Sequence, residues 1–183
     1  MQTNTAQTTS PEDVIAFWRE AGPARWFAKD AAFDAHFRDR FQNAHLAAAR
    51  RELDSWAATA AGSLALLILL DQFPRNSYRG SAHMFATDGL ARYFARRALE
   101  ARQDAEVDAA LRSFCYLPFM HSEDLSDQEL SMRLQLQLGP NEYAVNHRDI
   151  IERFGRFPHR NHLLGRQTTS EEAAYLDGGG FKG

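Results

Sequence analysis

The sequence predicts an all-α fold, and three observations support this prediction. Apolar residues recur at intervals of three or four, which places them on one face of a helix. Several of these segments start with a residue that commonly caps a helix N-terminus. No segment reads as a convincing strand. A chain of 183 residues can bury one substantial core. We expect a single domain of seven to eight antiparallel helices over residues 11–177, between a disordered N-terminal tail (1–10) and a flexible C-terminal tail (178–183).

Composition argues against several classes of protein. Hydrophobic residues make up 44% of the chain and charged residues 25%, which is ordinary for a globular protein. The net charge of −3 gives no support to wholesale nucleic-acid binding, and no phosphate loop or dinucleotide fingerprint is present. The single cysteine, Cys115, excludes an internal disulfide, and its apolar neighbours predict that it is buried. The N-terminus lacks the features of a signal peptide, and no apolar run approaches the ~20 residues of a membrane span, so we expect a cytoplasmic protein.

The first two helices have clear start signals. Ser10 is predicted to cap the first helix, which stops at Gly22. Asp30 is predicted to cap the second helix. Three phenylalanines of that helix fall at i, i+4 and i+8 and predict a stripe that faces the core: Phe33, Phe37 and Phe41.

The most apolar stretch of the chain, Leu64–Leu70, predicts a central helix over about residues 60–72. It is apolar on every face, so we expect other helices to surround it. Pro74 is predicted to end this helix, because Phe73, as the residue before a proline, is disfavoured in helical geometry. Asp71 then lies in the last turn, where its charge opposes the negative end of the helix dipole. We therefore expect it to have an arginine partner, from among Arg75, Arg79, Arg156 and Arg160.

Helix signals continue through the second half of the chain. Asp88 is expected to cap a helix that runs to about Arg102, and Asp104 to cap a further helix that ends at Pro118. The capping-box pattern that starts at Ser126 predicts another helix. The leucines expected on its core face are Leu130, Leu134 and Leu138, and two more helices are predicted over about 142–154 and from Ser170.

Three polar stretches interrupt this pattern and are predicted to meet around one site. The first, LALLILLDQFPRNSYRG, spans residues 64–80, and the second, FGRFPHRNHLLG, spans residues 154–165. Both contain Phe-Pro, then Arg-Asn, then a glycine, which we interpret as convergent turn chemistry rather than as a repeat. The third, PFMHSED, spans residues 118–124 and adds a histidine and two acids. Loops on a rigid frame commonly carry binding residues, so this region is the candidate site.

The arginines of these stretches suit recognition of an anion, because a guanidinium can bind a carboxylate or phosphate through two hydrogen bonds. We expect the partner to be an anionic small molecule or a peptide carboxylate, and neither nucleic acid nor a membrane. A structural role is the alternative, since asparagine stabilises turns and arginine can cap helix C-termini. Asp71 and Asp124 are expected to pair with the arginines. The candidate ligand-binding residues are Arg75, Asn76, Arg79, His147, Arg156, Arg160 and Asn161.

The same region offers candidates for general acid–base catalysis: His121, Glu123 and His159. A histidine beside carboxylates can form a base with an orienting partner. Equally, Ser122 and the two acids after it can cap a helix. The pairs His159-x-x-His162 and His121-x-Glu123 are only weak metal-binding fragments, so no metal and no cofactor is expected.

These residues leave three functions open. The first is a binding module whose pocket, lined by Arg, His and Asn, holds an anion. The second is an enzyme in which His121 or His159 acts as the general acid or base and arginines stabilise negative charge. In the third, the polar cluster only ties helix ends together, and function lies in a surface for a protein partner whose identity the sequence does not specify.

Several of these segments carry a family resemblance. They are LLDQFPRN with Arg79-Gly80 and FATD, then YLPFMHSEDL, and then HRDIIERFGRFPHRN. With these segments the chain resembles a bacterial family, domain-of-unknown-function family 924, from about Asp13 to Leu176. The resemblance implies an all-α fold similar to tetratricopeptide-like helical domains, and it implies no catalytic residues.

Overall fold

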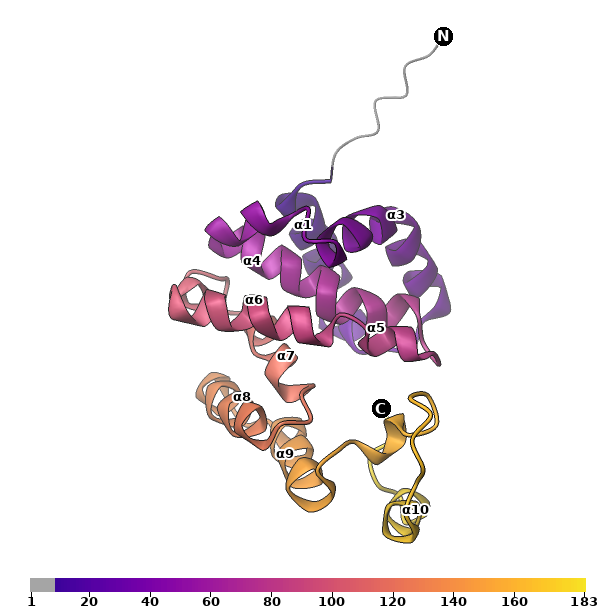
Figure 1. The fold of residues 1–183 in the computed structure, drawn as a ribbon. Helices are drawn as coiled ribbons and strands as arrows, with labels where there is room; N and C mark the ends of the chain where they lie inside the picture. The colour runs from indigo at the N-terminus through magenta and orange to yellow at the C-terminus, as the bar shows by residue number, and fades with distance from the viewer. Residues whose placement is uncertain (1–8) are drawn as a thin grey trace.

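The computed structural model describes residues 9–183, and within that range it contains ten α-helices and no strand (Figure 1). The predicted all-α fold is confirmed, whereas a tetratricopeptide-like arrangement stays a prediction. Most of the segment predicted to be disordered, residues 1–10, lies outside the described residues. The helices are α1 (Pro11–Ala21), α2 (Pro23–Trp26), α3 (Ala31–Ala49), α4 (Ala60–Leu67), α5 (Phe73–Ser77), α6 (Asp88–Glu100), α7 (Leu117–Met120), α8 (Leu125–Leu138), α9 (Glu142–Phe154) and α10 (Ser170–Asp177).

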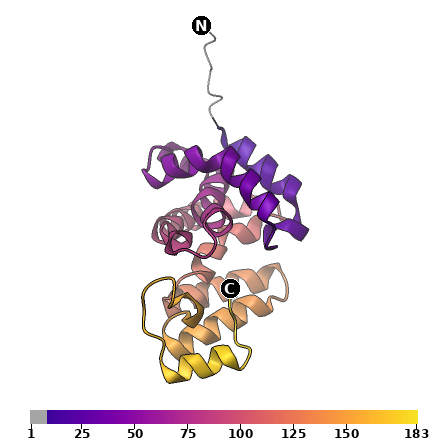
Figure 2. The same cartoon turned by 90° about the vertical axis from the view of Figure 1, so that its right-hand side faces the viewer.

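The helices form two groups that α7 joins (Figures 1 and 2). Helices α1 to α6 lie at one end of the molecule and α8 to α10 at the other. The larger hydrophobic core is built mainly from the first group and contains the whole of Leu64–Leu70. A smaller core surrounds Ile150, Ile151 and Phe157. The candidate site described below lies where the two groups meet.

Local signals explain where the first helices begin, and these predictions are confirmed. The Ser10 side chain caps α1 and the Asp30 side chain caps α3, as predicted. The Thr59 hydroxyl caps α4. Each accepts a hydrogen bond from an N–H of the first turn, which otherwise has no partner in the helix. The predicted core-facing phenylalanines are all buried: Phe33, Phe37 and Phe41.

The prediction that Pro74 ends the central helix is wrong. Phe73 keeps helical angles (φ −53°, ψ −49°). The chain passes from α4 through a π-helical turn, Ile68–Gln72 (η2), directly into α5. A π turn widens the helix locally and is often found at functional sites. Asp71 therefore lies inside a continuous helix and not in its last turn.

The π turn depends on outside donors, because Pro74 has no N–H to offer to the preceding turn. The hydroxyl of Thr87 donates to the carbonyl of Leu70 at 2.5 Å. Nδ1 of His45 donates to the carbonyl of Leu69 at 2.9 Å. These two side chains supply donors to the carbonyls of the π turn closest to the position of the missing N–H.

Two further predicted caps are corrected. The N-cap of α6 is Thr87, and Asp88 is the first residue of the helix, where its carboxylate is free to bind arginine. Asp104 starts no α-helix, because the chain that follows it forms short 3-10 turns, Gln103–Ala105 (η4) and Arg112–Cys115 (η5). The Asp104 carboxylate instead accepts a hydrogen bond from the hydroxyl of Tyr116 at 2.8 Å.

Helix α8 also differs from its prediction. Its N-cap is Asp124, two residues before the predicted start. Of the leucines predicted on its core face, Leu130 and Leu134 are partly buried and pack against the larger core. The fully buried residues of the helix are polar, because the end of α7 presents carbonyls that need donors. Nε2 of Gln128 donates to the carbonyls of Met120 and Ser122, at 2.7 and 2.6 Å, whereas Leu138 is exposed. The buried polar residues of α8 are Asp127, Gln128, Ser131 and Gln135.

Two expectations from composition can be compared with the structure. Cys115 is buried, as predicted, and burial raises the pKa of its thiol to about 12. None of the helices in residues 9–183 has the length and apolar character needed to cross a membrane.

Candidate functional site

The three predicted polar stretches meet at the junction of the two helix groups. The residues that meet come from the π turn, α5, the start of α6, the end of α7, helix α9 and the 3-10 turn Pro158–Arg160 (η6). We call this group the central cluster, and its members are Asp71, Arg75, Asp88, His121, His147 and Arg160.

Asp71 is the buried centre of the cluster, with 1% of its surface exposed. Its Oδ1 lies 3.1 Å from Nη1 of Arg75, and Nε2 of Gln72 donates to its Oδ2 at 2.6 Å. Burial alone would raise the pKa of Asp71, but the charge of Arg75 and the interaction with His121 outweigh burial and lower the pKa to about 2. Asp71 is therefore ionised at neutral pH and only accepts hydrogen bonds.

His121 is oriented by Asp71, whose Oδ1 lies 2.7 Å from Nδ1 of the imidazole. Because an ionised carboxylate only accepts, Nδ1 carries the proton, and Nε2 of the neutral ring keeps its lone pair. Burial and the charge of Arg75 lower the pKa of His121, and Asp71 opposes them only in part. The result is a neutral imidazole held by a buried carboxylate, which is the arrangement of a general base and its orienting group.

Arg75 and Arg160 converge on Asp88. Arg75 donates to both carboxylate oxygens, at 2.8 and 3.1 Å. Nη1 of Arg160 lies 3.7 Å from Oδ2, which is beyond hydrogen-bond distance. Burial alone would lower the pKa of Arg75, but Asp71 and Asp88 outweigh burial and raise it. The two Phe-Pro segments of the sequence thus supply one arginine each to the same carboxylate.

Arg160 has the fewest partners of the charged residues in the cluster. Only 6% of its surface is exposed, and its guanidinium makes no hydrogen bond to any residue in the described range. Its Nε is buried without a partner. The guanidinium carbon lies 4.6 Å from the ring centroid of Phe85 and 4.3 Å from that of Phe157. Burial and the charge of Arg75 lower the pKa of Arg160 to about 10, so it remains charged at pH 7.

Two further histidines lie beside Arg160. Nδ1 of His147 donates to the carbonyl of Tyr143 at 2.8 Å. Burial, followed by the charge of His121, lowers the pKa of His147 to about 4. Burial and the charge of Arg160 lower the pKa of His159 to about 3, and the buried Nδ1 of His159 has no partner among the described residues. Both rings are therefore neutral at pH 7.

Asn76 and Arg79, two of the predicted ligand-binding residues, are engaged with Asp34. Asn76 donates to one carboxylate oxygen at 2.7 Å, and Nε of Arg79 donates to the other at 2.5 Å. Asp34 was not among the residues predicted from the sequence. Its position within the phenylalanine stripe of α3, where a buried face otherwise carries no charge, was a usable signal.

Arg156 and Asn161, two more of the predicted residues, are engaged with Glu172, which was also missed. Arg156 donates to both oxygens of Glu172, at 2.6 and 2.9 Å, and Asn161 donates at 3.2 Å. The hydrogen bond from Arg156 is the main reason that the pKa of Glu172 is lowered to about 2. These contacts hold the start of α10 against the loop that follows α9.

The two acids after His121 do not join the central cluster. Glu123 accepts two hydrogen bonds from Arg166, at 2.7 and 3.0 Å, and one from the N–H of Phe157 at 2.8 Å. Asp124 was expected to pair with the arginines, but it caps α8. Arg166 was not among the residues predicted for this region.

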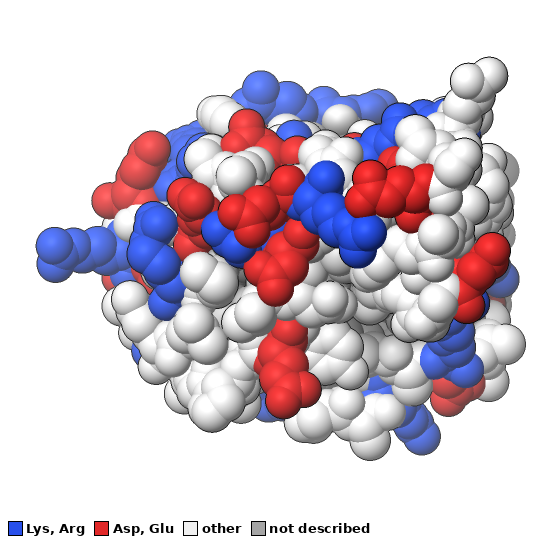
Figure 3. Space-filling view, turned by 90° about the horizontal axis from the view of Figure 1, so that it is seen from below, with Lys and Arg blue, Asp and Glu red and all other residues white. Residues whose placement is uncertain are grey.

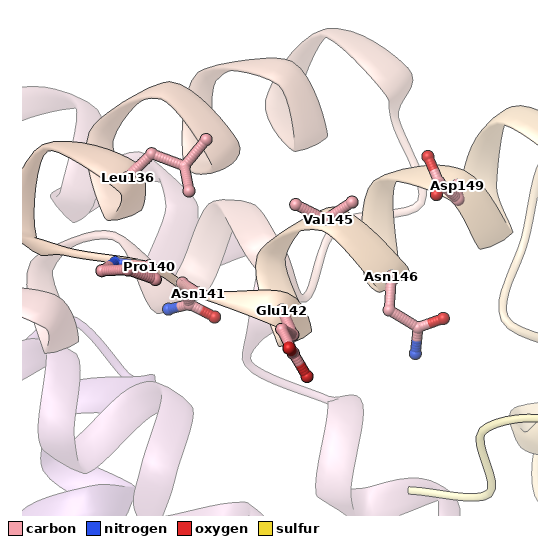
Figure 4. A pocket seen from close by; sticks show the side chains of 7 residues that line it. All are labelled: Leu136, Pro140, Asn141, Glu142, Val145, Asn146 and Asp149. Atoms are coloured by element: carbon pink, nitrogen blue, oxygen red, sulfur yellow. The ribbon is translucent and has the colours of Figure 1, made fainter.

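Two surface cavities lie away from the central cluster. The first, of about 390 Å³, opens where the end of α8 meets α9 (Figure 4), and it carries Glu142 and Asp149 but no cation. The second, of about 290 Å³, lies between α1 and α3, and its arginines, Arg25 and Arg40, are exposed. The first is lined by Leu136, Pro140, Asn141, Glu142, Val145, Asn146 and Asp149, and the second by Phe17, Glu20, Ala21, Arg25, Phe33, His36 and Arg40.

The end of the molecule seen in Figure 3 carries charges of both signs, and acidic and basic side chains lie interspersed on it. Arg148 pairs with Glu152, and Arg153 pairs with Glu171 at 2.9 Å. In the described part of the chain, no group of three or more His, Cys, Asp or Glu side chains is arranged to hold a metal ion.

Comparison with known proteins identifies the family. Residues 14–180 match the family described as "Bacterial protein of unknown function (DUF924)", which confirms the resemblance seen in the sequence. The fold is similar to that of the protein of unknown function ATU0120 from Agrobacterium tumefaciens, with a TM-score of 0.89 and 57% sequence identity, over 92% of this chain and 97% of that one. None of the curated proteins matches this sequence. The chain therefore belongs to the bacterial DUF924 family of proteins of unknown function.

Proposed function

We propose that the central cluster binds the carboxylate or phosphate group of a small molecule or peptide, with Arg160 as the anchoring residue. The observation that carries this proposal is the state of the Arg160 guanidinium, which is charged, buried and without a hydrogen bond. Burying such a group is costly unless a partner compensates it. An anion with two oxygens would supply the missing acceptors.

The surroundings of Arg160 favour an anion that approaches in the plane of the guanidinium. Two aromatic rings, Phe85 and Phe157, lie against the guanidinium and fix its orientation. Its nearest carboxylate, Asp88, already receives two hydrogen bonds from Arg75. Donors of Arg160 are thus left for a ligand, and a guanidinium binds carboxylate or phosphate oxygens best in its own plane.

The charges of the cluster make this binding sensitive to protons. Two arginines face two aspartates, so the formal charges of the cluster balance when its histidines are uncharged. An added anion leaves one negative charge, which protonation of His147 or His121 would compensate. Anion binding is therefore expected to raise the pKa of these rings.

Isothermal titration of the purified protein with acetate and with inorganic phosphate tests the proposal. The Arg160→Gln variant should lose at least about 90% of the affinity of the wild type, which corresponds to about 1.4 kcal/mol. Arg156→Gln is the matched control, because Arg156 is engaged with Glu172. Its stability should fall while its affinity stays unchanged. Equal affinity in wild type and Arg160→Gln would contradict the proposal and favour a purely structural cluster.

The short contact between His121 and Asp71 favours a second candidate function, general acid–base catalysis. Asp71 fixes the tautomer of His121 and leaves Nε2 as a proton acceptor. In this alternative, Arg160 would stabilise negative charge that develops on a bound substrate.

A panel of activated esters and phosphoesters tests the catalytic alternative. Turnover should follow a pH profile set by one histidine and should be lost in His121→Gln. His36→Gln alters an exposed histidine on α3 and should leave the rate unchanged. A rate that His121→Gln does not affect would remove this residue from any mechanism.

A further inference from the structure

The chain after α10 turns back toward the central cluster, and its sequence builds the turn. Gly179 has φ +89°, which side chains other than glycine rarely adopt. Gly180 packs so closely on Tyr175 that a Cβ would lie 2.5 Å from its ring. The N–H of Phe181 then donates to the hydroxyl of Tyr175 at 3.0 Å. In Figures 1 and 2 the C-terminal end accordingly lies level with the junction of the two helix groups.

This turn places Phe181 on the histidines beside Arg160. The ring centroid of Phe181 lies 4.6 Å from that of His147 and 5.1 Å from that of His159. Phe157, which contacts the Arg160 guanidinium, lies 5.3 Å from His147. Phe181 therefore fills an aromatic slot against the two histidines that lie beside Arg160, whose Nε is buried without a partner.

The segment that carries Phe181 has few hydrogen bonds to the rest of the molecule. Besides its ring contacts and its packing against the smaller core, Phe181 has the single hydrogen bond to Tyr175. The N–H of Gly180 donates to the carbonyl of Tyr175 at 2.9 Å, and Nζ of Lys29 donates to the carbonyl of Gly183 at 3.2 Å. The three consecutive glycines Gly178–Gly180 restrict the backbone angles less than residues with a Cβ would. Since neither surface cavity reaches the central cluster, displacement of Phe181 would give a ligand a way in.

We propose that Phe181 occupies the place of an aromatic group of the ligand, and that the site takes an aromatic carboxylate, which displaces this residue on binding. The proposal rests on the anion site at Arg160 and specifies its ligand class. The carboxylate would bind the Arg160 donors, and the ring of the ligand would replace that of Phe181 between His147 and His159. A ligand that must first displace the tail binds with an affinity reduced by the fraction of protein in the open state.

Titration of wild type and Phe181→Ala with acetate and with phenylacetate tests this proposal. Phe181→Ala should bind phenylacetate about tenfold more tightly than the wild type does. Its affinity for acetate should stay within about twofold of that of the wild type. Tyr175→Phe removes the hydrogen bond that holds the tail but keeps every ring, so it should show a smaller gain for phenylacetate alone. Phe27→Ala changes an exposed ring that stacks on Phe114 and should show no gain.

Two results would overturn the proposal while leaving the anion site intact. In the first, acetate binds through Arg160, but neither Phe181→Ala nor Tyr175→Phe gains affinity for phenylacetate. In the second, the variants gain the same affinity for acetate as for phenylacetate. The tail would then only cover the site, without an aromatic slot. If acetate binds none of the proteins, including the wild type, the anion site itself fails and this inference fails with it.

Discussion

Burial decides the charge state of the titratable side chains in the central cluster. It disfavours the charged form of each group, and a nearby opposite charge favours it. Asp71 faces Arg75 and remains a carboxylate, whereas His147 has no such partner and remains neutral. Arg160 remains charged because even a lowered pKa of about 10 lies above neutral pH.

The first prediction concerns Asp71. Asp71→Asn removes the negative charge that Arg75 and His121 face, and breaking a buried ion pair is costly. Because Arg75 keeps Asp88 as a partner, we expect a loss of about 3 kcal/mol in the free energy of unfolding, at the lower end of the usual range. Urea denaturation at pH 7 measures it, with the exposed Asp39→Asn as the control. Equal stability of the two variants would contradict this account of Asp71.

The second prediction concerns pH. The ordinary pKa of histidine is 6.5, whereas burial lowers that of His147 to about 4 and that of His159 to about 3. At a pH between the lowered pKa and 6.5, each of these histidines binds a proton in the unfolded chain but not in the folded protein. The free energy of unfolding is therefore greatest above pH 6.5 and falls as the pH is lowered. For His147 alone, the loss between pH 7 and pH 5 is about 2 kcal/mol.

Denaturation of His147→Gln at the two pH values tests this prediction. The variant should lose about 2 kcal/mol less than the wild type when the pH is lowered from 7 to 5. His36→Gln, which changes an exposed ring, should behave as the wild type does. A pH dependence that is the same in all three proteins would show that His147 titrates normally.

Among the elements, the π turn has the greatest effect on the site. It lets the helix continue past Pro74, so that Asp71 and Arg75 project from one continuous element. A helix that stopped at the proline would leave the two residues on separate segments. The hydroxyl of Thr87 supports the turn from the start of α6.

The third prediction separates the hydroxyl of Thr87 from its methyl group. Thr87→Val keeps the shape of the side chain but removes the hydrogen bond to the carbonyl of Leu70. We expect it to lower the free energy of unfolding by about 1 kcal/mol. Thr87→Ser keeps the hydroxyl and should retain most of that stability. If the two variants are equally stable in urea, the hydrogen bond does not support the π turn.

The sequence predicted elements whose signals are local. The caps Ser10 and Asp30 and the phenylalanine stripe of α3 depend on residues within one or two turns, and the structure confirms them. The end of the central helix was predicted wrongly, because the donors that let it continue, His45 and Thr87, are distant in sequence from the proline. The same holds for α8, whose polar face depends on the carbonyls of α7.

For the candidate site, the residue types in the sequence predicted where the site lies, but not which residues pair with one another. The polar stretches were recognised from their composition, and the structure brings Asp71, Arg75, His121, His147 and Arg160 together. Which arginines are engaged elsewhere was not predictable, because their partners are single acids on other helices. Those acids are Asp34, Glu123 and Glu172.

At the scale of the whole molecule, the central cluster lies between two hydrophobic cores. The helix group around the larger core supplies Asp71, Arg75 and Asp88, and the group around the smaller core supplies His147 and Arg160. A ligand bound at Arg160 would therefore contact both groups of helices. Sites at such junctions are common, because small relative movements of the two sides can open and close them.

The fourth prediction follows from the overall charge of this junction. Because an added anion favours protonation of His147 or His121, lowering the pH should strengthen binding. We expect acetate to bind at least about tenfold more tightly at pH 5.5 than at pH 8. Titration calorimetry in buffers of different ionisation enthalpy would also detect the proton that is taken up. An acetate affinity that does not change with pH would exclude this coupling.

The most direct test of the central claim is a nitrogen-15 NMR titration that follows the Nε–H resonances of the arginines as acetate is added. Arg160→Gln assigns the resonance of Arg160, and Arg156, which is engaged with Glu172, serves as the internal reference. The account predicts that the Arg160 resonance shifts, saturates and exchanges more slowly with water, while that of Arg156 does not move. A resonance of Arg160 that stays in place while acetate shifts others, or one that moves no more than Arg156, would contradict an anion site at this residue.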